Sequence, residues 1–157
     1  MNPMDRYDSI FQYYAARYGL DWQRIKRQAI AESSLNPRAL SPVGAMGLMQ
    51  FLGATWHEWG QGDPFNPEAS IEAGCRYMQY LYGCYGEIPD PDERYRFALS
   101  AYNWGRGNVN KALAHAREDS PPHARGWTRS LIKADAYWPL SPARAGMDPL
   151  LTNSTPS

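Results

Sequence analysis

Apolar residues recur three or four positions apart along most of the chain, and this spacing is typical of helix faces. The pattern predicts helices over residues 5–18, 22–33, 45–51, 53–59, 67–82, 91–103, 107–118 and 127–138. No stretch favours a strand, and no internal repeat is present. The sequence therefore predicts an all-α fold in one domain.

Turn-forming and capping residues separate these segments. Asp21 is expected to cap the helix over 22–33, and Asn66 before Pro67 is expected to start the helix over 67–82. The stretch 36–44 holds two prolines and a glycine, which predicts a loop. After Pro139 the pattern ends, so we expect a domain over residues 1–138 and a flexible tail over 139–157.

Charge excludes some function classes. The 157 residues carry 16 Lys and Arg against 16 Asp and Glu, and this neutrality argues against a dedicated nucleic-acid binder. The charge is uneven, because residues 58–93 hold eight acids and one base, whereas residues 94–133 hold eight bases and two acids. No stretch approaches the ~18 apolar residues of a membrane span. The first residues also lack the basic and apolar regions of an export signal.

The two cysteines and three histidines do not form a metal or catalytic motif, so no metal and no cofactor is expected. Cys75 and Cys84 are too far apart for a disulfide if one helix holds both, at about 1.5 Å per residue. A helix that ended at Gly83 would leave a bridge possible, although free thiols are favoured.

Glu32 stands out within the helix predicted over 22–33. The apolar stripe runs through Trp22, Ile25 and Ala29, and Glu32 falls at its edge, whereas Ala31 is expected to point away. A carboxyl group at the edge of a buried face has a raised pKa, as a general acid near neutral pH requires. The alternative is a helix-end residue that reaches solvent or an arginine.

Three blocks that follow in order carry a family resemblance. The first runs from Glu32-Ser33 to Gly47-Leu48-Met49-Gln50, the second is Ile71-Glu72-Ala73-Gly74 with Tyr77-Met78 after Asn66-Pro67, and the third contains Ala101-Tyr102-Asn103. Over residues 22–110 the chain resembles the family 1 soluble lytic transglycosylases (SLT domain), the goose-lysozyme-like branch of the lysozyme superfamily. The resemblance implies a lysozyme-like domain of about seven helices that acts on the glycan strands of peptidoglycan.

The implied reaction cleaves the β-1,4 bond between N-acetylmuramic acid and N-acetylglucosamine without water. By resemblance, Glu32 is the catalytic residue. It would protonate the glycosidic oxygen and then take the proton of the muramyl C6 hydroxyl, which attacks C1 and leaves a 1,6-anhydro end.

The resemblance also implies supporting residues. Ser41 is expected near the catalytic carboxylate or the substrate, and Met49 and Gln50 are expected to line the cleft. Tyr102 is expected to approach Glu32, with Asn103 beside it. Gly44, Gly47 and Gly74 are expected to shape the backbone around the cleft. Three departures from the family pattern are Leu52, Cys75 and Trp104.

Two other functions stay open on the same scaffold, a hydrolytic muramidase and a weakly active murein-binding structural component. Between Ser33 and Gly62 the only carboxylate is Glu58, so the additional Asp residues of goose-type lysozymes have no counterpart there, which favours the transglycosylase. Because murein lies outside the cytoplasmic membrane and no export signal is visible, we expect a phage virion component or endolysin, or delivery by specialised secretion.

Overall fold

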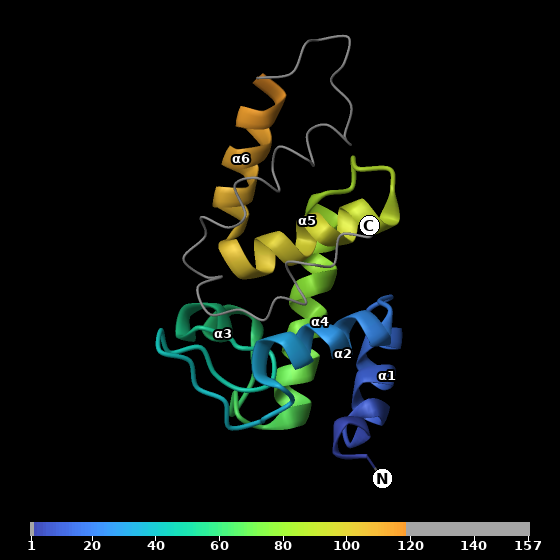
Figure 1. Ribbon diagram of the computed structural model, residues 1–157, viewed down its shortest axis with the longest axis vertical. Coiled ribbons are helices and arrows are strands. Elements are labelled where there is room, and N and C mark those ends of the chain that lie inside the picture. The colour runs from blue at the N-terminus through green and yellow to red at the C-terminus, as the bar shows by residue number, and fades with distance from the viewer. Residues whose placement is uncertain (1, 119–157) are drawn as a thin grey trace. The chain divides into compact units, whose positions relative to one another are not determined.

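The computed structural model of the protein describes residues 2–118, and the side chains of residues 2–114. Within this part the chain forms a short 3-10 turn, η1 (Pro3–Asp5), and the helices α1 (Asp8–Arg17), α2 (Trp22–Ser33), α3 (Gly53–Trp59), α4 (Pro67–Cys84), α5 (Pro91–Trp104) and α6 (Arg106–Glu118) (Figure 1). The described part contains isolated β-bridges but no β-strand, so the all-α prediction is confirmed. The helix predicted over 127–138 and the tail over 139–157 lie outside the described residues.

The described residues fall into two compact units. Residues 2–79 form the first unit, and residues 80–118 belong to the second. In the first unit α1 packs against α2, and in the second α5 packs against α6. None of the described helices is both long and apolar enough to cross a membrane.

Side-chain caps fix three of the helix starts. Asp21 accepts a hydrogen bond from the backbone N–H of Gln23 at 2.9 Å, and Asn66 accepts one from Ala69 at 2.9 Å. Asp90 caps α5 in the same way. Each cap satisfies backbone N–H groups that have no partner inside the helix, so the predicted starts are confirmed.

Two helix predictions were wrong. The first helix begins at Asp8 rather than residue 5, because η1 occupies the preceding residues. Residues 45–51 are not helical, because Gly47 and Gln50 adopt left-handed φ values of 76° and 55° that an α-helix cannot contain. That segment instead forms turns in which Met46 pairs with Leu40 and Phe51. The helix predicted over 67–82 runs on to Cys84, so the alternative of a helix that ends at Gly83 is not the one observed.

The core of the first unit surrounds α2. Ile25, Gln28, Ala29 and Ala31 are all buried along it. The prediction that Ala31 faces away was therefore wrong, because α2 is covered on more than one side. On α4 the Cys75 side chain is fully buried, and both Cys75 and Cys84 are free thiols on that one helix.

Candidate active site

Glu32 lies in the last turn of α2, and its carboxyl group is shielded from solvent. The side chain as a whole is partly buried, whereas its Oε1 atom is fully buried and has no hydrogen-bond partner among the described residues. Burial raises the pKa of Glu32 from its ordinary value of 4.5 to about 8. No charged neighbour is among the causes of this shift, so the alternative of an arginine partner finds no support in the described part.

The chain turns sharply just after Glu32. Ser34 and Leu35 both have left-handed backbone conformations, with φ values of 54° and 58°. The N–H of Ser34 donates to the carbonyl of Ile30, which closes the helix, and Leu35 is almost fully buried. A non-glycine residue in the left-handed region raises the conformational energy of the backbone by about 1–2 kcal/mol. The buried Leu35 side chain helps to hold the turn.

Ser33 connects this helix end to the next motif. Its Oγ lies 3.0 Å from the carbonyl oxygen of Ala29 and 2.9 Å from that of Leu48, so these two acceptors share the single hydroxyl proton. Leu48 belongs to the Gly47–Gln50 block. The sequence motif contains Ser33 but predicts no role for it. Its distant partner is a backbone carbonyl, and a pattern of side chains does not reveal such a partner.

Ser41 stabilises a turn. Its Oγ accepts a hydrogen bond from the N–H of Ala45 at 3.0 Å, and its own N–H donates to the carbonyl of Ala45 at 2.9 Å. Gly44 lies inside this turn with a φ of 89° and needs its conformational freedom there. Among the described residues no hydrogen bond joins Ser41 to Glu32.

Met49 and Gln50 act inside the fold of this segment. Met49 is fully buried, and its N–H donates to the Oγ of Ser70 on α4 at 3.1 Å. A Cβ atom at Gly74 would lie only 2.8 Å from Met49 Cε, so glycine allows this close approach. The amide of Gln50 donates to the carbonyls of Gly47 and Ala39 at 2.9 and 3.2 Å. Both residues thus brace the segment between α2 and α3.

Tyr102 and Asn103 belong to the second unit. Tyr102 is half-buried on α5. Asn103 is buried, and its Nδ2 donates to the carbonyl of Leu99 at 3.1 Å. Trp104 is half-buried and ends α5. Tyr102 and Asn103 thus belong to a different compact unit from Glu32.

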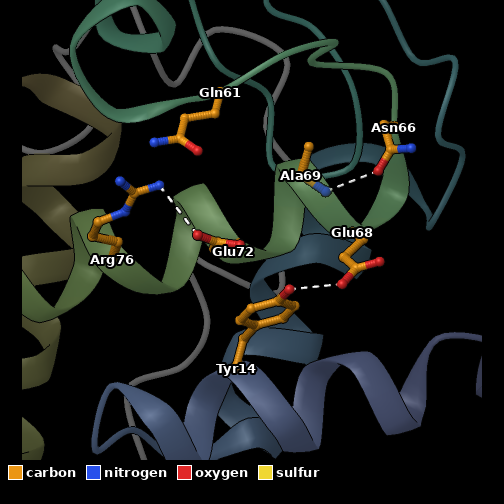
Figure 2. A pocket seen from close by; sticks show the side chains of 7 residues that line it. All are labelled: Tyr14, Gln61, Asn66, Glu68, Ala69, Glu72 and Arg76. Atoms are coloured by element: carbon orange, nitrogen blue, oxygen red, sulfur yellow. Dashed lines mark hydrogen bonds and ion pairs between the residues drawn. The ribbon is translucent and has the colours of Figure 1, made fainter.

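A separate pocket of about 220 Å³ lies in the first unit between α1, α4 and the segment before α4 (Figure 2). The Tyr14 hydroxyl donates to Glu68 at 2.7 Å, and Arg76 lies 3.5 Å from Glu72. The bond to Glu68 raises the pKa of Tyr14. None of the residues predicted from the sequence as site residues lines this pocket, whose lining is Tyr14, Gln61, Asn66, Glu68, Ala69, Glu72 and Arg76.

In the described part of the chain, no group of three or more His, Cys, Asp or Glu side chains could hold a metal ion. In the first unit the candidate site offers the shielded carboxyl group of Glu32 and the hydrogen-bonded segment that follows it.

Comparisons with known proteins find a matching family, similar sequences and similar folds. Residues 9–123 match the model of the family described as "Transglycosylase SLT domain". The chain is 38% identical over 112 residues to membrane-bound lytic murein transglycosylase F of Marinobacter nauticus, which covers 71% of this chain and 22% of the relative. The enzyme of the same name from Desulfosudis oleivorans is 38% identical over 114 residues, with 73% and 25% covered.

Two solved structures share the fold. The 70 kDa soluble lytic transglycosylase SLT70 from Escherichia coli gives a TM-score of 0.58 at 27% identity, over 96% of this chain and 26% of that one. An inactive mutant of lytic transglycosylase Slt from Pseudomonas aeruginosa gives 0.60 at 20% identity, over 88% and 24%. The chain thus spans about a quarter of the length of the relatives it matches.

Proposed function

The chain belongs to the transglycosylase SLT domain family, and on that premise we propose that it is a peptidoglycan lytic transglycosylase. The proposed substrate is the glycan strand of murein, cleaved at the β-1,4 bond between N-acetylmuramic acid and N-acetylglucosamine. The observation that carries the proposal is the shielded carboxyl group of Glu32, in the position of the family's acidic motif.

The proposed chemistry uses this carboxyl group twice. With a pKa of about 8, Glu32 is protonated at neutral pH and can give its proton to the glycosidic oxygen as the bond to C1 breaks. The resulting carboxylate accepts the proton of the muramyl C6 hydroxyl as that oxygen bonds to C1. The proton thus returns to Glu32, no water is consumed, and a 1,6-anhydro end forms.

A single carboxyl group suffices for this reaction, whereas glycosidases that hydrolyse the bond ordinarily use two. The nearest other carboxylate along the following segment is Glu58, which is exposed on α3. This arrangement supports the transglycosylase over the muramidase on the same scaffold.

The supporting roles are proposed from the motifs together with the contacts described above. We assign Ser41, Met49 and Gln50 to the segment that shapes the substrate side of the first unit, where their contacts hold its turns. We assign Tyr102 and Asn103 to the same reaction from their motif. Substitution of these residues, followed by an assay of murein cleavage, tests the assignments.

The decisive experiment is digestion of purified murein followed by mass analysis of the sugar ends. We expect the protein to yield anhydro ends, each one water lighter than a hydrolysed end, and Glu32→Gln to yield none while remaining folded. Glu58→Gln is the matched control, because it neutralises an exposed carboxylate of the same unit, and it should cleave normally. Purely reducing ends would establish the muramidase, and murein binding without cleavage would establish the structural component.

We also propose that the protein reaches periplasmic murein as part of a phage particle, as a lysis enzyme or through a specialised secretion machine. Mass spectrometry of purified particles and of secreted fractions tests this route. Absence from both, in cells where the protein is made, would contradict delivery by particle or secretion.

A further inference from the structure

The hydroxyl of Ser33 joins two segments that are 15 residues apart in the sequence. It lies 2.9 Å from the carbonyl oxygen of Leu48, a residue whose side chain is fully buried, and the bond itself is partly buried. Its second acceptor, the carbonyl of Ala29, is four residues earlier on the same helix. One side chain therefore links the last turn of α2 to the Gly47–Gln50 block.

The carboxyl group next to Ser33 lacks such support of its own. Glu32 Oε1 has no hydrogen-bond partner in the described part of the chain, so no polar contact at that atom fixes its direction. Its position therefore depends on the backbone of the last helical turn and on packing. A bond that ties this turn to the neighbouring segment restrains the carboxyl group that the turn carries.

We infer that Ser33 is a positioning residue for Glu32, which it holds in its shielded position by bonding to the carbonyl of Leu48. The catalytic part of this inference rests on the proposed function. The structural part, that Ser33 holds Glu32 in place, does not depend on activity. If Ser33 is replaced by alanine, the partly buried Leu48 carbonyl loses a donor and the end of α2 loses its tie to the neighbouring segment. Glu32 then gains access to water, which favours its charged form.

The first experiment measures the pKa of Glu32 directly, by carbon NMR of side-chain-labelled protein without substrate. In Ser33→Ala we expect the pKa of Glu32 to fall by about one unit or more, because shielding is lost. Ser33→Thr keeps a hydroxyl and should restore the native value. Ser100→Ala is the matched control, since Ser100 also bonds to the carbonyl four residues earlier, at 2.9 Å, but on α5 in the other unit.

The second experiment measures the pH profile of murein cleavage. Ser33→Ala should lose about 10- to 100-fold in rate at neutral pH, as expected when a catalytic group is displaced, and its alkaline limb should move to lower pH. Ser33→Thr should recover both. Should Ser33→Ala not fold, Ser33→Cys keeps the volume with a weaker donor, and the same readouts apply.

The two proposals can fail separately. A folded Ser33→Ala or Ser33→Cys protein with the native pKa of Glu32 and the native pH profile would overturn the role of Ser33. A wild-type protein that leaves murein uncleaved would instead overturn the proposed function, and the NMR result would still decide whether Ser33 positions Glu32.

Discussion

At the scale of single residues, the carboxyl group of Glu32 links stability to pH. In the fold its pKa is about 8, whereas in the unfolded chain it returns to its ordinary value of 4.5. Between these values the unfolded chain releases a proton that the folded protein keeps. The free energy of unfolding therefore falls as pH rises from 4.5 to about 8. Below and above this range the titration of Glu32 does not change it.

Glu32→Gln should remove this dependence, because the amide does not titrate. We expect the variant to be more stable than the native protein by roughly 1–3 kcal/mol at pH 8 and about equally stable at pH 4. Urea unfolding at both pH values measures the difference, and Glu58→Gln serves as the exposed control. A difference that does not change with pH would show that Glu32 titrates normally.

Gly47 gives a second prediction at this scale. Its φ is 76°, and a Cβ atom there would lie 2.1 Å from the carbonyl oxygen of Pro64, so neither the backbone nor the space admits a side chain. Gly47→Ala should lower the free energy of unfolding by about 3 kcal/mol or more.

The matched control for Gly47 is Gly83, which lies inside α4 with open space around its Cβ position. Gly83→Ala should stabilise the protein by about 0.5–1 kcal/mol, because alanine favours helix. Denaturant unfolding of both variants gives the comparison. A Gly47→Ala protein as stable as the native one would contradict the close contact.

At the scale of elements, a hydrogen bond fastens α1 to α4. The buried Tyr14 donates to Glu68 across 54 positions of sequence, and Glu68 lies in the first turn of α4 (Figure 2). Tyr14→Phe should cost about 1–2 kcal/mol of unfolding free energy. A double-mutant cycle with Glu68→Gln isolates the pair, and strictly additive effects would show that the bond contributes nothing.

The elements also show which features are accessible from sequence. The caps at Asp21 and Asn66 were predictable, because a cap and the N–H groups that it binds lie within three residues. The helix expected over 45–51 was wrong, because apolar spacing does not reveal the left-handed backbone of Gln50. Such a conformation is held by contacts to Ala39 and Gly47, which only the folded segment provides.

The same distinction applies to the candidate site. Helical periodicity placed Glu32 at the edge of the apolar stripe and left its burial open, and its proposed role followed from the motifs. The bond from Ser33 to Leu48 and the bond from Tyr14 to Glu68 could not be predicted, because each joins residues that only folding brings together. Sequence thus indicates which groups are chemically able to act, and the fold determines what holds them.

At the scale of the whole molecule, the motif residues fall in two compact units, with Glu32 in the first and Tyr102 in the second. From its motif alone we propose that Tyr102 takes part in the reaction. Tyr102→Phe should therefore slow murein cleavage by about tenfold or more, because a hydroxyl that supports the developing charges is lost. Tyr82→Phe is the control from the same unit. It also removes a tyrosine hydroxyl, but it keeps the aromatic ring that Arg94 contacts. Rates are compared per folded molecule, and equal rates for the two variants would exclude the Tyr102 hydroxyl from the reaction.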